Sequence, residues 1–263
     1  MNNAVERAID FICEKYSEPL SLADIADSAI LSRFHFCRIF RDATGVTPGR
    51  FLSATRIYQA KRMLLNTGMN VTDIAFAVGY NSLGSFSNHF TDSVGISPGR
   101  FRRISRSKEF KTPRPPRASS SQATVTGQIT LPPGYARARV YVGAFDTPIV
   151  QRQPAASTTV DAPAPDQPSS YRLEEVPTGK WFLRAVAVAD NADPEPWTSR
   201  TLLVGGTGQV SVAPGAAISA GFELRHRRPT DLPILLALPN LDSELQGAAS
   251  HPAEFAAAAG SGS

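Results

Sequence analysis

Apolar residues recur every three or four positions through the first hundred residues, the spacing of helices that bury one face. The spacing predicts helices over 4–16, 22–28, 33–44, 48–66, 83–94 and 98–104. Two helix starts are well marked: Ser21 with Asp24 forms a capping box, and Thr47-Pro48 pairs an N-cap residue with a proline at the first helical position. Ser32 is expected to cap the helix that follows it.

One stretch of this predicted helical sequence occurs twice. Residues 24–51, DIADSAILSRFHFCRIFRDATGVTPGRF, return as residues 73–101, DIAFAVGYNSLGSFSNHFTDSVGISPGRF. The offset is 49 residues at first and 50 from Ser82 on, so the second turn carries one extra residue. A repeated supersecondary unit is stronger evidence of architecture than a single short motif. Each copy reads as helix, tight turn, helix, an arrangement that projects one helix into a groove of DNA.

Beyond residue 104 the pattern changes. Residues 105–122 are rich in proline, serine and basic residues, which predicts a linker; a solvated spacer and a segment lying along phosphates both remain open. Seven short runs between residues 125 and 224 are rich in β-branched and aromatic residues and are separated by Pro/Gly turns, as in an antiparallel sandwich. The proline-rich residues 151–169 are expected to form a surface loop.

These patterns predict a multidomain α + β protein, an all-α tandem helix-turn-helix domain followed by an antiparallel β-sandwich. The expected boundaries are 1–104 for the helical domain, 105–122 for the linker, 123–228 for the sandwich and 229–263 for a partly disordered tail. Within the tail, the apolar run 232–241 is expected to pack back on the sandwich.

Charge is distributed unevenly along the 263 residues. Residues 1–111 hold 15 Lys and Arg against 10 Asp and Glu, a net +5, and the remainder holds 12 against 13, a net −1. The basic excess therefore lies with the repeated helical unit, as a polyanion-binding module would have it. No apolar run approaches the ~20 residues of a membrane span, and the N-terminus lacks the features of a leader peptide, so a cytoplasmic protein is expected.

No set of residues typical of catalysis or metal binding stands out. Cys13 and Cys37 fall in predicted helices and are expected to be buried, inert thiols. Glu174-Glu175 is more typical of a solvated strand edge than of an acid/base pair. Six aromatic residues of the second half could line a ligand pocket but are more typical of a core: Tyr135, Tyr141, Phe145, Trp181, Phe182 and Trp197. We therefore expect no enzyme, metal or cofactor.

The stretch 4–104 resembles the DNA-binding domain of the AraC/XylS family of bacterial transcription regulators. The resemblance rests on the repeat, on Arg56, Ala60 and Leu64-Leu65 in the linking helix, and on the second-copy text IAxxVGYxSxxxFxxxF followed by GxSPxxFR. It covers about 100 of the 263 residues. It implies that helices 33–44 and 83–94 enter successive major grooves, about 34 Å apart on double-stranded DNA.

Position by position, the resemblance implies base contacts at Arg33, Phe34, Cys37, Arg38, Ser85 and Asn88. Arg38 can make a bidentate contact to guanine, and Asn88 can read adenine. The second helix departs from the family pattern, since Asp92 would repel phosphate where a basic residue is common. The first helix is therefore expected to supply most of the sequence readout.

Phosphate contacts set affinity without reading sequence. They are expected at His35, Arg41, Arg50, Arg56, Arg62, Arg100, Arg102 and Arg103, and Lys61 is a further candidate. Some of these side chains could have a structural role in place of a phosphate contact. His35 could be a packed first-turn residue, and Arg56 and Arg62 could form surface ion pairs.

The order of the two halves is the reverse of the common family order, in which a sensory or dimerising domain comes first. Residues 123–225 resemble prealbumin-like or carboxypeptidase-regulatory-like β-sandwiches through the sequence YRLEEVPTGKWFLRAVAVAD.

The leading hypothesis is a sequence-specific transcription regulator whose β-domain dimerises, senses a ligand or binds a partner, and RNA polymerase is among the partners implied. The alternative is a two-domain binding protein whose sandwich recognises carbohydrate or protein. The sequence does not define the operator, the effector or the oligomeric state.

Overall fold

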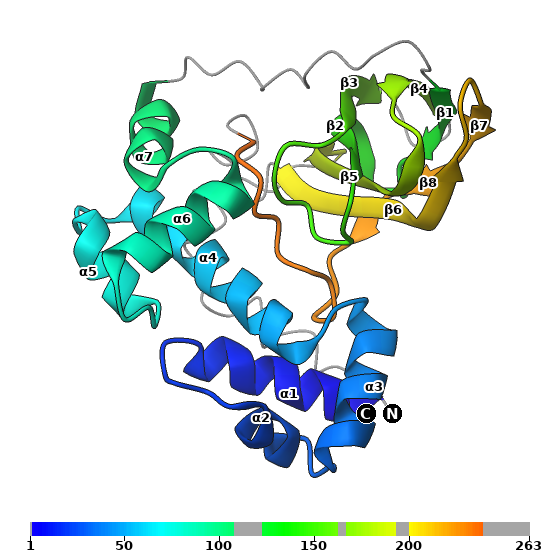
Figure 1. Cartoon of the computed structure of the whole chain (residues 1–263). Helices are drawn as coiled ribbons and strands as arrows, with labels where there is room; N and C mark the ends of the chain where they lie inside the picture. Colours follow the sequence, from blue (N-terminus) through cyan, green and yellow to red (C-terminus); the bar gives the residue numbers. More distant parts are fainter. Residues whose placement is uncertain (1, 108–122, 163–166, 193–199, 239–263) are drawn as a thin grey trace. The chain divides into compact units, whose positions relative to one another are not determined.

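The computed structural model of the chain describes residues 2–107, 123–162, 167–192 and 200–238 (Figure 1). The chain divides into two compact units, one combining Met1–Phe110 with Arg228–Ser263 and the other spanning Lys111–Arg227. The first unit holds the helices and the second holds the strands, which confirms the predicted fold class. Nearly all of the expected linker and the residues after 238 lie outside the described residues.

Seven helices lie in the described part of the helical unit: α1 Asn2–Lys15, α2 Leu22–Ser28, α3 Arg33–Thr44, α4 Pro48–Asn66, α5 Val71–Ala77, α6 Leu83–Val94 and α7 Pro98–Ser107. Four of them, α2, α3, α4 and α6, have the predicted bounds. The last helix, α7, continues past the expected end at residue 104. Each copy of the repeat is thus a short helix and a longer one, α2 with α3 and α5 with α6, and α4 links the copies.

Side chains at the helix starts explain these bounds. Ser21 Oγ accepts a hydrogen bond from the backbone N–H of Asp24 (3.2 Å), and the Asp24 carboxylate accepts one from the Ser21 N–H (2.8 Å), which confirms the capping box. The bond from the Ser21 N–H is the main reason that the pKa of the Asp24 carboxyl lies below its usual value. Thr47 caps α4 through the N–H of Arg50. Ser32 stands at the N-cap of α3, but its side chain makes no capping bond, so that expectation was wrong.

A chain of three phenylalanine rings forms the centre of each copy. In the first copy the ring centroids of Phe36 and Phe40 lie 5.4 Å apart, and those of Phe40 and Phe51 lie 5.5 Å apart. The same chain recurs fifty residues later, with spacings of 5.6 and 5.8 Å, in Phe86, Phe90 and Phe101. All these side chains are buried, and such aromatic pairs stabilise a core beyond the area they bury.

Nine strands lie in the described part of the second unit: β1 Ala123–Thr130, β2 Tyr135–Phe145, β3 Ala156–Ala162, β4 Ser169–Val176, β5 Gly179–Asn191, β6 Arg200–Val212, β7 Ala217–Ser219, β8 Phe222–Glu223 and β9 Arg225–His226. One sheet has the order β4-β1-β7, with β8 also paired to β1, and the other has the order β3-β2-β5-β6-β9. Most pairs are antiparallel, while the short pairs of β1 with β7 and β8 are parallel.

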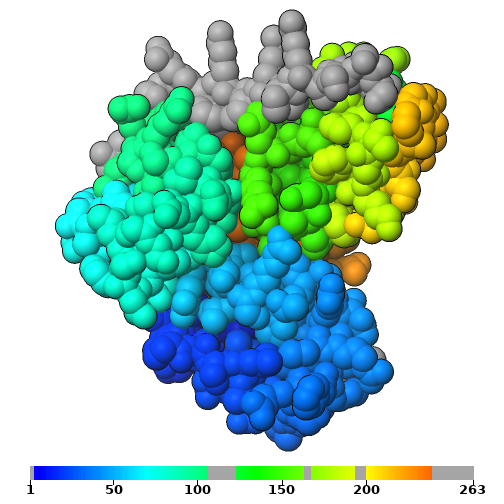
Figure 2. Space-filling view, in the orientation of Figure 1, coloured from blue at the N-terminus to red at the C-terminus, as the bar shows by residue number. Residues whose placement is uncertain are grey.

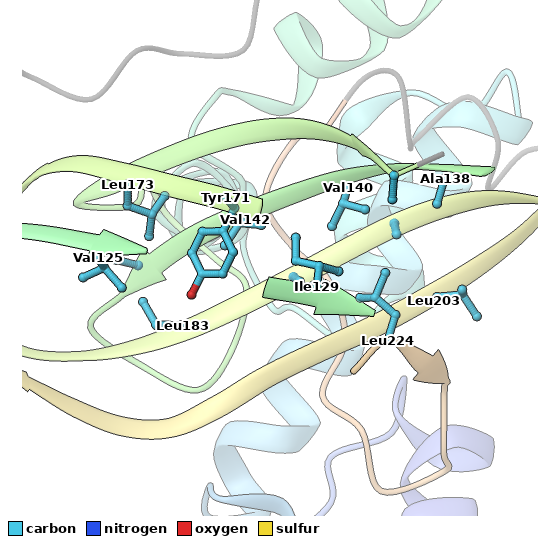
Figure 3. Close-up of a cluster of buried hydrophobic side chains, with 14 of the residues drawn as sticks. Val125, Ile129, Ala138, Val140, Val142, Tyr171, Leu173, Leu183, Leu203 and Leu224 are labelled. Carbon is cyan, nitrogen blue, oxygen red and sulfur yellow. The ribbon is translucent and has the colours of Figure 1, made fainter. Parts of the chain in front are cut away.

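The two sheets share one apolar core. Figure 3 shows side chains from both sheets in this core, and those that it labels are Val125, Ile129, Ala138, Val140, Val142, Tyr171, Leu173, Leu183, Leu203 and Leu224. Burial raises the pKa of the Tyr171 phenol to about 12, and its hydroxyl donates to the carbonyl of Ala220. Tyr135, Tyr141 and Phe145 are buried side chains too, in keeping with a structural role.

Two expectations for the second half of the chain were wrong. Residues 151–169 were expected to be a loop, yet β3 lies within them and pairs antiparallel with β2 from Ala138–Ala162 to Ala144–Ala156. The runs 201–204 and 209–212 are parts of one long strand, β6. In both cases the pairing partner, rather than the local sequence, decides where the strand begins and ends.

The apolar run 232–241 does not have the partner expected for it. Its described part, up to Leu238, belongs to the helical unit and not to the sandwich unit. The backbone N–H of Ala237 donates to the carbonyl of Val94, the last residue of α6 (3.1 Å). The sandwich is therefore inserted, in sequence, between two parts of the helical unit.

Candidate nucleic-acid interface

One face of α3 is exposed and basic. Arg33, Arg38 and Arg41 are all exposed on it, while Phe36 and Phe40 turn inward to the core. The exposure of Phe34 is unusual, because 93% of this aromatic side chain is open to solvent. An exposed aromatic ring between arginines can offer a ligand an apolar contact beside charged ones.

Arg38 has a neighbour one helical turn away. Its Nη2 lies 3.3 Å from Nδ1 of His35, which accepts the hydrogen bond when that nitrogen carries no proton. Both side chains are exposed, so His35 is not the packed residue considered as an alternative. The contact limits the positions of the Arg38 guanidinium without using all of its donors.

The equivalent face of α6 is polar but carries no positive charge. Ser85, Asn88 and Asp92 are exposed on it, and α6 contains no Lys or Arg. His89 lies half-buried on the other side, where its Nδ1 is hydrogen-bonded to the Tyr80 hydroxyl. Burial raises the pKa of the Tyr80 phenol to about 12. His89 therefore packs the turn, a role that sequence reasoning did not assign.

Two arginines occupy matching places at the starts of α4 and α7. Arg50 and Arg100 are each the third residue of their helix, and both are exposed. Arg103, one turn after Arg100, is exposed as well, whereas Arg62 is half-buried.

The guanidinium groups of Arg56 and Arg102 are hydrogen-bonded to the protein itself. Arg56 donates to the carbonyls of Tyr16 and Glu18, both at 2.7 Å, and so ties α4 to the end of α1. Arg102 donates to the carbonyls of Leu64 (3.2 Å) and Met69 (2.5 Å) and so ties α7 to the end of α4. Burial lowers the pKa of the Arg56 guanidinium. This geometry favours a structural role for both side chains.

Two further expectations fail on burial. Lys61 is only 2% exposed, so it does not reach phosphate in this structure. The side chains of Cys13 and Cys37 are half-buried, not fully buried. The partial exposure of Cys37 leaves it at the edge of the basic face of α3.

The described residues provide neither a cluster of metal ligands nor a helix that could span a membrane. No group of three or more His, Cys, Asp or Glu side chains in that part of the chain is arranged to hold a metal ion. None of the helices there combines the length and the hydropathy that a membrane crossing requires.

Comparison with known proteins gives a family match for the region that contains this face. Residues 25–104 match the model of a family described as a helix-turn-helix domain. The chain is 31% identical over 90 residues to the lactose operon transcription activator of Staphylococcus xylosus, covering 34% of this chain and 32% of the relative. It is 33% identical over 82 residues to the transcriptional activator RhaS of Yersinia pestis (strain Pestoides F), covering 31% and 30%. The chain thus spans about a third of the length of these relatives.

Two solved structures are also similar to part of this chain. A transcriptional regulator with an AraC-type DNA-binding domain from Chromobacterium violaceum is 27% identical, with a TM-score of 0.39, over 41% of this chain and 96% of that one. The DNA-binding domain of AdpA, solved in complex with a target DNA, is 28% identical, with a TM-score of 0.39, over 40% of this chain and 95% of that one.

Proposed function

We propose that this chain is a sequence-specific transcription regulator that reads the major groove with α3 and α6, because residues 25–104 match a helix-turn-helix family and the relatives reported above are named transcription activators. The observation that carries the proposal is the exposed basic face of α3, with Phe34 and Arg38 at its centre. The fold gives that face a rigid support, since the phenylalanine chain behind it is buried.

Base readout comes mainly from α3. Arg38 is aimed at guanine, where its planar guanidinium can bond to two acceptors at once, and His35 supports its position. Phe34 offers an apolar surface of the kind that meets the 5-methyl group of thymine. Arg33 and the half-buried Cys37 lie at the edges of this contact.

The second helix mainly positions the protein on its site. Asn88 can read adenine and Ser85 can bond to either a base edge or the backbone, but Asp92 sets a negative charge on the same exposed face. A helix with a carboxylate and no cation contributes less to affinity than α3, because phosphates dominate the electrostatics of DNA.

Phosphate contacts come from the exposed arginines around these helices. We assign this role to Arg41, Arg50, Arg100 and Arg103, with Arg62 at the margin. Arg56 and Arg102 are left out of the set because their guanidinium groups already bind backbone carbonyls. The sandwich would then serve dimerisation, ligand sensing or contact with a partner such as RNA polymerase.

The test is footprinting of the full chain on DNA selected from a random pool, at two salt concentrations. A protected stretch of about two helical turns with a shared sequence supports a monomeric reader, and a stretch of about four turns supports a dimer. Uniform, strongly salt-dependent protection without a selected sequence would overturn the proposal, because counterion release alone would then explain binding.

A further inference from the structure

The segment Leu232–Leu238, here named the strap, extends along the helical unit without regular secondary structure. In Figure 1 it is the orange to red-orange trace that passes α4 and α6. From Ile234 to Leu238 every side chain is between 1% and 5% exposed. The same colour marks the strap in the space-filling view (Figure 2). A run buried to this degree is not a loose tail.

The strap joins two elements that are separate in the fold of the repeat. The N–H of Ala237 donates to the carbonyl of Val94 at the end of α6 (3.1 Å). The carbonyl of Leu236 accepts from Nζ of Lys61 on α4 (3.0 Å). A Leu236 methyl also lies 3.9 Å from the position that a Cβ would take on Gly95. One short segment therefore contacts both the linking helix and the end of the second recognition helix.

Lys61 is a buried lysine that binds the strap directly. Among the residues that the structure describes, it is the one buried Lys, Arg, Asp or Glu, with 2% of the residue exposed. Its ammonium lies 5.4 Å from the ring centroid of Phe101, on α7. Burying an ammonium is unfavourable unless acceptors replace the water it loses, and the Leu236 carbonyl supplies one.

The two copies of the repeat differ at the point where the strap binds. Thr44 ends α3, and its hydroxyl donates to the carbonyls of Phe40 (2.8 Å) and Val46 (3.1 Å), which closes that helix end from within its own copy. The counterpart fifty residues later is Val94, which has no hydroxyl. The Val94 carbonyl, whose counterpart in the first copy is not one of the carbonyls that the Thr44 hydroxyl binds, accepts from the N–H of Ala237, in a segment far away in the sequence.

We propose that the strap is an intramolecular peptide ligand of the helical unit, and that it fixes α6 against α4 so that the second recognition helix is correctly placed on DNA. The inference rests on the proposed function, since placement matters only if both recognition helices read one site. The helical unit holds the strap through the ammonium of Lys61, which donates to the Leu236 carbonyl, and through the Val94 carbonyl, which accepts from the Ala237 N–H, so both bonds use main-chain groups of the apolar segment.

The experiment uses the full chain and two variants that weaken the strap in different ways. Lys61→Met keeps the apolar stem of the side chain but removes the donor to Leu236, and Ala237→Pro removes the N–H that binds Val94. Lys15→Met is the matched control, because it removes the same charge from a lysine side chain that is 40% exposed.

Hydrogen exchange without DNA tests the docking. In the wild type we expect the Ala237 amide to be protected, and in both strap variants we expect exchange at least tenfold faster in the peptides covering 232–238 and the end of α6. Lys15→Met should leave both peptides unchanged. An unprotected strap in the wild type, or variants that exchange like the wild type, would overturn the docking.

Titration of the DNA site selected by footprinting tests the consequence. Both strap variants should bind that site about tenfold more weakly than the wild type and should bind random-sequence DNA equally well. Faster exchange with unchanged specific binding would overturn the positioning role. A wild type that selects no sequence would refute the proposed function itself, and the exchange result would still decide whether the strap is docked.

Discussion

Ile30 and Gly79 occupy the same place in the two copies of the repeat, and both have a left-handed backbone, with φ of 58° and 85°. Each follows the end of the short helix of its copy and makes the same bonds. Ile30 N–H donates to the Asp27 carbonyl (2.9 Å), and Gly79 N–H donates to the Phe76 carbonyl (3.0 Å). This is the pattern of a Schellman turn, whose left-handed position favours glycine. A β-branched residue there, as in the first copy, is strained.

Exchanging the residue type at this position should change stability in opposite directions. Ile30→Gly should stabilise the helical unit by about 0.5–1 kcal/mol, because relief of left-handed strain exceeds the entropy cost of glycine. Gly79→Ala should destabilise it by about 1–3 kcal/mol, because a Cβ would lie 2.7 Å from the Ser17 carbonyl oxygen. Circular dichroism at 222 nm follows this unit during denaturation, and tryptophan fluorescence follows the sandwich, which holds both tryptophans.

Gly49→Ala is the control for these changes. Gly49 lies in the first turn of α4, and a Cβ there would meet nothing within 4 Å, so the substitution should be neutral or slightly stabilising. A loss of stability in Ile30→Gly would show that its exposed side chain makes a favourable contact not seen in the structure.

Readout by the first helix predicts an order of effects among base contacts. Arg38→Ala should cost about 1–3 kcal/mol of discrimination at one guanine of the selected site, roughly a 5- to 150-fold loss, and Asn88→Ala should cost less. Competition binding with singly substituted sites measures both values. A larger loss of specificity in Asn88→Ala than in Arg38→Ala would make α6 the main reader.

Phe34 and Phe36 are two residues apart on α3 but should respond differently to alanine. Phe34→Ala should leave the unfolding midpoint within the error of the wild type, because its side chain is 93% exposed, and should weaken binding to sites with a thymine opposite it. Phe36→Ala should destabilise the helical unit by about 3–5 kcal/mol, because the ring is fully buried. If Phe34→Ala binds every single-base variant of the site as the wild type does, Phe34 has no role in readout.

Substitutions at Arg50 and Arg56 should have different effects, because we assign Arg50 to a phosphate contact and Arg56 to a structural role. Arg50→Ala should weaken binding about equally for all sequences and reduce the slope of log affinity against log salt by about 1. Arg56→Ala should lower the helical unit's unfolding free energy by about 1–3 kcal/mol, because it removes two hydrogen bonds from a charged donor to carbonyls. It should leave the salt slope unchanged, provided that binding is measured well below the unfolding temperature.

Asp190 predicts a pH effect in the sandwich. Its carboxylate binds Arg137 (2.6 Å) and Arg200 (3.0 Å), and the hydrogen bond from Arg137, the largest influence, holds the pKa of the carboxyl below its usual value. The resulting stabilisation is present above the unfolded pKa of about 4 and is lost as pH falls through the lower folded pKa. Asp190→Asn should therefore lower sandwich stability by about 0.5–1 kcal/mol at neutral pH and flatten its decline in acid.

Tryptophan fluorescence during urea unfolding at several pH values measures this effect. Asp161→Asn is the matched control. Asp161 is paired with Arg139, but its side chain is 75% exposed, so this ion pair should contribute little to the stability of the sandwich. Equal pH profiles for the two variants would contradict the assignment to Asp190.

The sequence predicted the helical elements well because their signals are local. The bounds of α2 and α4 follow from Ser21 and Thr47, whose caps lie within three residues of the groups they bind. The repeat showed the same helix pattern twice, so each copy supported the helices predicted for the other. The family resemblance pointed to the exposed face of α3. Local signals and tertiary packing agree in this part of the chain.

The features that the sequence could not predict depend on distant partners. The sequence marks Lys61 as one more basic residue on a long helix, and its acceptor in the fold, the Leu236 carbonyl of the strap, lies 175 residues away. β3 was missed because its residues, ASTTVDA, are weakly apolar, and pairing with β2 makes them a strand. The structural roles of Arg56 and Arg102 likewise depend on carbonyls about forty residues away.

The insertion of the sandwich between α7 and the strap affects how the protein is made. The strap leaves the ribosome more than a hundred residues after α7, a delay on the order of ten seconds at common rates of synthesis. During that interval the seven helices can form while the end of α6 still lacks its partner, and Lys61 keeps water as its acceptor. A nascent or prematurely terminated chain would therefore carry both recognition helices without the bond between Ala237 and Val94. Synthesis of the strap is thus the step that supplies the partner of the Val94 carbonyl and of the Lys61 ammonium.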